Sequence, residues 1–212
     1  MNFYQNGAMR ISDDRYSRER ARLELALRFL RHEARTQTIR AWTGLSDDRI
    51  RKLYRSYMSQ ARRELPRHRG KSPHQIAFFT RSQRLQEESA VLASVLSLLG
   101  ALPGVAAAGA AAAGVAVGAA GTAAAAAGDG ADGSPALTRG ELLCQAFEVF
   151  RLLLPSAQIS FEHAVFFASS LARGDQLRLG PCCDCGSLMV AERFPLRAAR
   201  CHRCAAPTPT RG

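Results

Sequence analysis

A chain of 212 residues, 47% of them hydrophobic, can bury one core and carry one small attached module. Its formal net charge of +11 points to a polyanionic partner, either nucleic acid or an anionic membrane surface. Between residues 10 and 84 lie 20 of the 29 Lys and Arg but only 8 of the 18 Asp and Glu, so this part holds the positive excess. Most of these basic residues are arginines, whose side chains pair well with phosphates and with guanine edges. A solvated basic face without a ligand is the alternative.

Secretion and catalysis are both disfavoured by the sequence. No apolar segment follows Met1, so we expect no secretory signal peptide and a cytoplasmic location. Six cysteines in a reducing compartment are then expected to be metal ligands or free thiols. The chain has five histidines and neither a phosphate-binding loop nor a nucleophile elbow, so we do not expect an enzyme.

The first helix is predicted over about residues 17–35. Its apolar stripe has helical spacing and consists of Leu23, Ala26, Leu27, Leu30 and Ala34. A shorter helix is expected over 38–43, broken at Gly44. The next helix restarts at Ser46, whose hydroxyl can cap it, with Asp47 and Asp48 in the first turn.

Residues 38–54 have the layout of a helix-turn-helix unit. Gly44 suits the left-handed turn position. The residues expected to pack the two helices together are Ile39, Leu45, Ile50 and Leu53. The outward face of the second helix then presents the candidate DNA-binding residues Arg49, Arg51, Lys52 and Arg55. A plain helical hairpin inside a bundle is the alternative interpretation.

The middle of the chain is uncharged from residue 89 to 128. We interpret residues 90–100 as a buried core helix and roughly 104–135 as a low-complexity Ala/Gly insertion of no assigned function. A membrane-spanning segment is the competing interpretation. Gly100, Pro103 and Gly104 interrupt the run, and Ala and Gly are weakly apolar, so we expect no membrane insertion.

Two further helices are expected after the insertion. The first carries Leu143, Phe147, Phe150 and Leu154 at helical spacing and ends at Pro155. The second is capped by Ser160, stopped by Gly174, and carries Phe161, Val165, Ala168 and Leu171. These stripes are expected to be core and not a cofactor pocket, and Cys144 is expected to be a buried, unpaired core thiol.

The strongest local pattern is a pair of CxxC motifs. Cys182 and Cys185 form the first, Cys201 and Cys204 form the second, and fifteen residues separate them. Four thiolates on two tight turns suit a closed tetrahedral Zn²⁺ site, which is structural and not catalytic. Disulfides and an iron–sulfur or redox centre are the alternatives. Cys183 is a possible competitor of Cys182, although its spacing to Cys185 is too tight.

The expected fold class is mainly α, with a helix-turn-helix-like unit and a small C-terminal four-cysteine zinc ribbon. The expected domains are a basic helical part at 1–100, the insertion at 101–138, a helical continuation at 139–175, and a zinc-binding module with a tail at 176–212.

Several motifs together resemble the FlhC family of flagellar transcription activator subunits. They are the sequence Leu-Ser-Asp-Asp-Arg-Ile-Arg-Lys-Leu-Tyr at 45–54, the Arg-Gly pair at 69–70, the helices at 141–173, and the cysteine region from Leu179 to Cys204. The resemblance covers 23–67 and 139–207, and more weakly 70–99. The family's zinc ligands correspond to Cys182, Cys185, Cys201 and Cys204.

The resemblance implies a subunit that assembles with an FlhD-type partner into a ring-like hetero-oligomer. That assembly binds and bends duplex promoter DNA and recruits RNA polymerase, which activates bacterial flagellar and motility genes. An RNA-binding or ribosome-associated zinc-ribbon protein is the rival hypothesis. The basic half has few aromatic residues, chiefly Trp42, Tyr54 and Tyr57, which is unfavourable for a platform that stacks bases.

Overall fold

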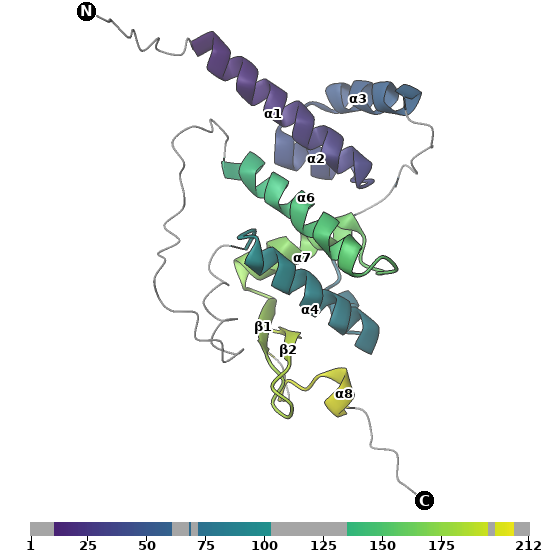
Figure 1. The fold of residues 1–212 in the computed structure, drawn as a ribbon, viewed down its shortest axis with the longest axis vertical. Coiled ribbons are helices and arrows are strands. Elements are labelled where there is room, and N and C mark those ends of the chain that lie inside the picture. Colours follow the sequence, from purple (N-terminus) through teal and green to yellow (C-terminus); the bar gives the residue numbers. More distant parts are fainter. Residues whose placement is uncertain (1–10, 61–67, 69–71, 103–134, 195–197, 206–212) are drawn as a thin grey trace, which may run out of the picture. The chain divides into compact units, whose positions relative to one another are not determined.

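The computed structural model describes residues 11–60, 68, 72–102, 135–194 and 198–205. Within these ranges the chain is mostly helical, with one two-stranded hairpin near its C-terminal end (Figure 1). The elements are α1 (Ile11–Arg31), α2 (Thr36–Thr43), α3 (Asp47–Gln60), η1 (Ile76–Phe79), α4 (Gln83–Leu98), α6 (Pro135–Leu153), α7 (Phe161–Arg173), β1 (Leu177–Pro181), β2 (Leu188–Glu192) and α8 (His202–Ala205). The mainly α prediction is confirmed.

The chain divides into two compact units. The first unit contains α1, α2, α3 and the start of α6 as far as Glu141, and the second contains the remaining elements. The expectation of one helical part over 1–100 differs from this division. The physical reason is that α4 packs against α7 and β2 in the second unit.

Helix α1 begins earlier and ends earlier than the predicted range of 17–35. Its buried face is also rotated from the predicted stripe. The fully buried side chains include Leu25 and Phe29, which lie outside that stripe, while Leu23 and Leu27 are only half-buried. The correction has a tertiary cause, because α2 and α3 pack on α1 and so decide which side is covered.

The α2–α3 turn has the predicted geometry. Gly44 ends α2 in the left-handed conformation at φ 68°, and its N–H donates to Arg40 O at 2.9 Å. Leu45 then turns inward and is buried together with Ile39 and Ile50. The buried Thr43 hydroxyl donates to Ile39 O at 2.7 Å, which satisfies a polar group at the junction of the two helices.

The start of α6 packs closely on α1 and α2 inside the first unit. A Cβ placed on Gly140 would lie 2.7 Å from Leu25 Cδ2 and 3.4 Å from Trp42 Cε3, so any larger residue would require the Leu25 side chain to shift. Arg139 lies over the Trp42 ring, with 6.0 Å between the guanidinium carbon and the ring centroid. Trp42 is therefore occupied by intramolecular contacts.

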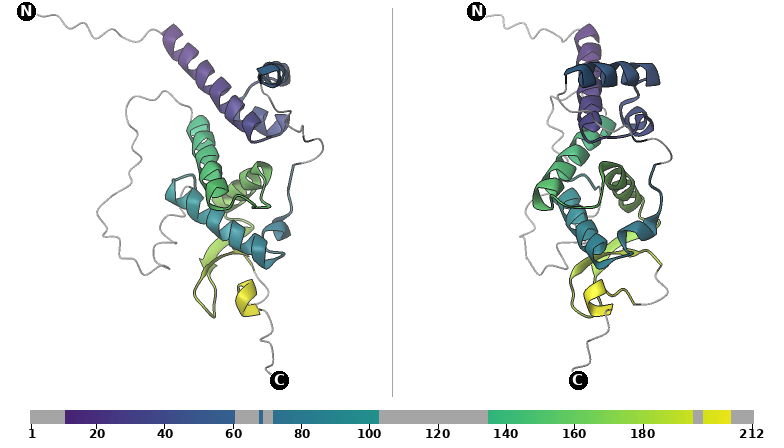
Figure 2. Two further views of the ribbon diagram at one scale, coloured as in Figure 1. Left: turned by 45° about the vertical axis from the view of Figure 1, so that its right-hand side comes forward. Right: turned by 90° about the vertical axis from the view of Figure 1, so that its right-hand side faces the viewer.

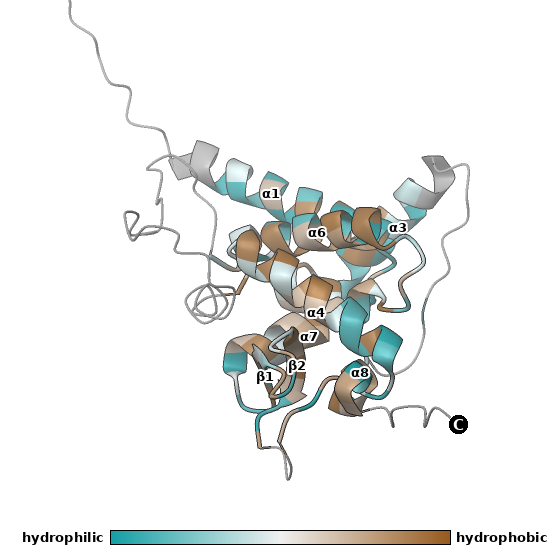
Figure 3. Cartoon of the chain, turned by 60° about the horizontal axis from the view of Figure 1, so that its bottom comes forward, coloured by the Kyte–Doolittle hydropathy of each residue, from teal (hydrophilic) through white to brown (hydrophobic). Residues whose placement is uncertain are grey.

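The core of the second unit is aromatic, as the predicted stripes indicated. Phe147 and Phe161 pack edge to face at 5.2 Å, and Phe79 contacts Phe167 at 4.7 Å between ring centroids. Figure 3 shows the brown hydrophobic residues along α4 and α6. The Ser160 hydroxyl accepts from His163 N–H at the start of α7, and Gly174 ends that helix at φ 63°, as expected.

A buried carboxylate joins the α6–α7 connection to α4. Glu88 is 4% exposed, and its two oxygens accept hydrogen bonds at 2.9 Å from Arg84 Nε and Gln158 N. A buried charge needs such partners, because an unpaired one would shift its protonation or destabilise the fold. Arg84 also donates to Ser156 O.

Strands β1 and β2 form an antiparallel hairpin that carries the cysteine region. Leu179 is paired with Val190, and Pro181 with Leu188. The hairpin lies against α4 in both views of Figure 2, and residues of α4 and β2 are in contact. Strand β2 therefore follows directly after the loop that holds the first CxxC motif.

Two sequence expectations concern the middle of the chain. The Ala/Gly insertion at 101–138 falls mostly outside the described residues, but its last residues belong to α6, which begins at Pro135. The expected core helix at 90–100 is α4, which starts earlier because Ser82 caps it by accepting from Leu85 N–H at 3.3 Å.

Of the helices in the described ranges, none has the length and apolarity needed to span a membrane.

Candidate metal centre

The four cysteines of the two CxxC motifs come together at the tip of the hairpin. Their sulfurs all lie within 4.8 Å of one another, and Cys185 Sγ is 3.6 Å from Cys201 Sγ. A tetrahedral zinc–thiolate site with ~2.3 Å bonds has sulfur–sulfur edges of about 3.8 Å. The observed sulfur–sulfur distances therefore lie in the range that a four-thiolate metal site needs.

The first CxxC motif is shaped by the hairpin turn. Cys182 ends the β1 side, and its N–H donates to Ser187 O at 2.9 Å. Gly186 at φ 72° turns the chain back, while its N–H donates to Cys182 O at 3.0 Å. This loop leaves Cys185 exposed and Cys182 buried on the inner side.

The second CxxC motif is carried by α8, one short turn of helix. The N–H groups of Cys204 and Ala205 both donate to Cys201 O, at 3.0 and 2.9 Å. The Cys201 N–H in turn donates to Cys182 Sγ at 3.3 Å, which joins the two motifs directly. An N–H group aimed at sulfur favours the thiolate, which is the form that binds metal.

The pKa shifts of the clustered cysteines favour the binding of a cation. Backbone hydrogen bonds from Cys201, Cys185 and Asp184 lower the pKa of Cys182 to about 6. Hydrogen bonds involving the Ser187 hydroxyl and N–H lower the pKa of Cys185. In contrast, the thiol of Cys204 forms hydrogen bonds with the sulfurs of Cys201 and Cys185, which raises the pKa of Cys204 because these contacts favour its protonated form. A bound metal ion would remove this conflict.

Cys183 and Cys144 lie outside the cluster. Cys183 is exposed, its Sγ is 3.4 Å from the neighbouring Asp184 carboxylate, and that carboxylate pairs with Arg200 at 3.1 Å. Cys144 is buried in α6. All six cysteines lie within the described residues and none forms a disulfide, so the disulfide alternative is not supported.

The four candidate DNA-binding residues all lie exposed on α3 but are not equivalent. Arg49 forms an ion pair with Glu19 of α1, and Arg51 pairs with Asp48 at 3.0 Å. For Lys52 and Arg55, no ion pair is present among the described residues. The sequence did not indicate this difference, because the Arg49 partner lies thirty residues away on another helix.

The sequence patterns indicated no role for Gln86 and His202, which join the cysteine cluster to α4. The His202 N–H donates to Gln86 Oε1 at 2.8 Å, and His202 Nε2 lies 2.8 Å from Thr80 O. These pairs are 116 and 122 residues apart in the chain, and no spacing pattern could have connected them.

The described residues thus contain a four-sulfur cluster that can hold a metal ion and an exposed basic face on α3. Comparison with protein-family models gives no match, and no curated protein matches the sequence.

Proposed function

We propose that this chain is a zinc-stabilised DNA-binding subunit of a transcription activator. The observation that carries the proposal is the α2–α3 unit, in which a tight glycine turn and a small apolar interface present a basic helix face to solvent. This arrangement is typical of helix-turn-helix proteins, in which the second helix enters the major groove.

Zinc is the metal that suits the cluster best. Four cysteine sulfurs within 4.8 Å of one another favour Zn²⁺, which binds thiolates strongly and takes tetrahedral coordination in structural sites. Such a site has no open position for water or substrate, so its role is to stabilise the fold and not to catalyse. The residues that would hold the ion are Cys182, Cys185, Cys201 and Cys204.

Phosphate binding is assigned mainly to Lys52 and Arg55. Each has its charge exposed on α3, whereas Arg49 and Arg51 must first give up a carboxylate partner. Arg40 pairs with Asp47 across the turn at 3.7 Å, which neutralises an acidic group that would otherwise repel DNA. The net positive charge of the first part of the chain supports the same partner.

The assembly partners rest on the FlhC resemblance alone. We infer an FlhD-type subunit, promoter DNA and RNA polymerase as partners, with flagellar and motility genes as targets. Co-expression with an FlhD-type protein followed by size-exclusion chromatography tests the first of these. Separate elution of the two chains would remove the partner from the proposal while leaving the DNA interface open.

DNA binding is tested by a gel-shift titration of the complex at several salt concentrations. The double variant Lys52→Ala/Arg55→Ala should weaken duplex binding most and lower the log–log salt slope by about 0.9 for each phosphate that is no longer bound. The matched control is Arg173→Ala/Arg178→Ala, two exposed arginines of the second unit. The proposal is wrong if the control pair weakens binding and the α3 pair does not.

The same assay with single-stranded RNA tests the rival RNA-binding hypothesis. A preference for RNA over duplex DNA would support it. Base stacking needs exposed aromatic faces, but Trp42 packs on Phe29 and under Arg139, so it is not free to stack. For this reason we expect the duplex to be preferred.

A further inference from the structure

The contact between the four-cysteine cluster and α4 contains a buried polar side chain. Gln86 is only 7% exposed, although it lies on a helix whose other buried positions are mostly apolar. A buried amide destabilises a fold unless it is hydrogen-bonded. Its Oε1 accepts from the His202 N–H at 2.8 Å, so α4 supplies an acceptor for the first residue of α8.

His202 is held from a second direction by its ring. Its Nε2–H donates to the carbonyl oxygen of Thr80 at 2.8 Å, which fixes the tautomer because a carbonyl can only accept. Thr80 directly follows η1, and Ser82 caps α4 two residues later. One residue of the cysteine region is therefore attached to two consecutive parts of the helical body.

The position of His202 in the chain gives this attachment a consequence for the metal centre. It directly follows Cys201 and precedes Cys204 by two residues, so both of these cysteines belong to the turn that Gln86 holds. The Cys201 N–H then orients toward Cys182 Sγ at 3.3 Å. Residues that orient the ligands of a metal commonly change its affinity by one to two orders of magnitude.

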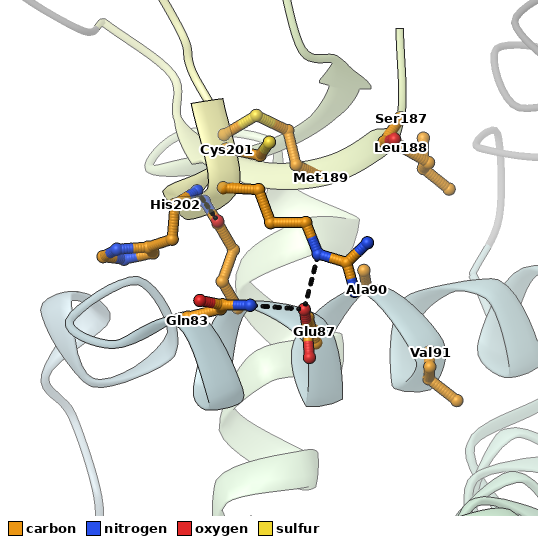
Figure 4. Close-up of a pocket in the computed structure, with 11 residues that line it drawn as sticks. Gln83, Glu87, Ala90, Val91, Ser187, Leu188, Met189, Cys201 and His202 are labelled. Atoms are coloured by element: carbon orange, nitrogen blue, oxygen red, sulfur yellow. Dashed lines mark hydrogen bonds and ion pairs between the residues drawn. The ribbon is translucent and has the colours of Figure 1, made fainter. Parts of the chain in front are cut away.

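Few other contacts hold the turn that contains Cys201 and His202 in its orientation. Beside His202 lies a groove of about 270 Å³, whose walls include Ala90 and Val91 of α4 and Leu188 and Met189 of β2 (Figure 4). An open groove means that apolar packing does not lock the turn on this side. The ion pair of Arg203 with Glu87 at 3.3 Å is exposed, so it adds little.

We propose that Gln86, together with the Thr80 carbonyl, is a positioning residue for the metal centre, which makes the affinity of the cluster for its ion depend on α4. The inference rests on the proposed zinc site. Because such coupling is reciprocal, the bound ion also stabilises α4 and η1 through His202. The metal therefore stabilises part of the helical body as well as the hairpin that carries the cysteines.

The main test compares zinc affinities of the full-length chain by competition with a chromogenic chelator. In the variant Gln86→Met the side chain keeps its length and loses the acceptor, which leaves the His202 N–H unpaired. We expect zinc binding to weaken roughly 10- to 100-fold. The matched control Gln145→Met changes an exposed glutamine of α6 and should bind zinc as the parent does.

Two further measurements separate a positioning role from a general loss of stability. Cobalt(II) substitution reports the ligand geometry, and the d–d absorption of Gln86→Met should differ from that of the parent, whereas Gln145→Met should not. Amide hydrogen exchange across α4 should accelerate when zinc is removed from the parent chain. If Gln86→Met does not fold, His202→Ala removes the bond to Thr80 and should give the same loss of affinity.

The outcomes distinguish this inference from the proposed zinc site. A parent chain that binds no zinc overturns the zinc site itself. If the parent binds zinc and both Gln86→Met and His202→Ala bind it equally tightly, only the coupling to α4 is wrong. Exchange in α4 that is unaffected by zinc removal would likewise contradict the coupling.

Discussion

The α2–α3 pair and the four-cysteine cluster are both small, but they are stabilised in different ways. The helix pair buries Ile39, Leu45 and Ile50 in an apolar interface and needs no ligand. Among the described residues, the core of the cluster has four buried side chains, and two of them are cysteines, Cys182 and Cys201. We therefore expect the cluster to depend on metal–ligand bonds for its folding, whereas the helix pair depends on packing.

Removal of a ligand should break the cluster and has the largest expected effect. We expect Cys204→Ser to abolish binding of about one zinc per chain, because apparent zinc binding energies of about 10–16 kcal/mol also serve as folding energy in such modules. Metal analysis and the yield of folded protein measure this loss. Helix α3 should keep its structure, which circular dichroism and hydrogen exchange can follow.

The neighbouring cysteine supplies the control. Cys183→Ser changes an exposed thiol one residue from a ligand and should retain the zinc. Loss of zinc from Cys183→Ser, with retention in Cys182→Ser, would show that the ligand set includes the wrong member of this pair.

The reverse experiment breaks the helix pair and has the next largest effect. Ile39 is fully buried, and Ile39→Ala should lower the free energy of unfolding of the first unit by about 2–5 kcal/mol, since it removes apolar packing and leaves a cavity. Denaturant unfolding measures this change. Zinc content should be unaffected, and the exposed Arg55→Ala should change stability little. Zinc loss in Ile39→Ala would show that the two regions are not independent.

Substitution of the glycine in the α2–α3 turn should have the smallest effect on stability. Gly44 has φ 68° and open space around its missing Cβ, so Gly44→Ala should cost only the conformational strain, about 1 kcal/mol. Gly44→Asn should cost less, because asparagine tolerates the left-handed conformation. The equilibrium unfolding of the first unit measures both. Equal stability of all three chains would mean that the turn is not a constraint on the α2–α3 pair.

Local patterns in the sequence were sufficient for several elements. The spacing of two CxxC motifs identified the four cysteines that the structure brings together, because short turns can place such ligands on one site. Ser160 and Gly174 marked the ends of α7, and Gly44 marked the α2–α3 turn, because capping and left-handed residues act within one helical turn.

Contacts between distant residues were decided only by the tertiary structure. The sequence could not tell that α1 buries Leu25 and Phe29, since two overlapping stripes are apolar and the partner helices select between them. Nor could it distinguish Arg49, which pairs with Glu19, from the exposed Lys52. The bond between Gln86 and His202 spans 116 residues. Periodicity and motif spacing describe neighbours along the chain, whereas such pairs form because folding brings separate helices and strands to the same place.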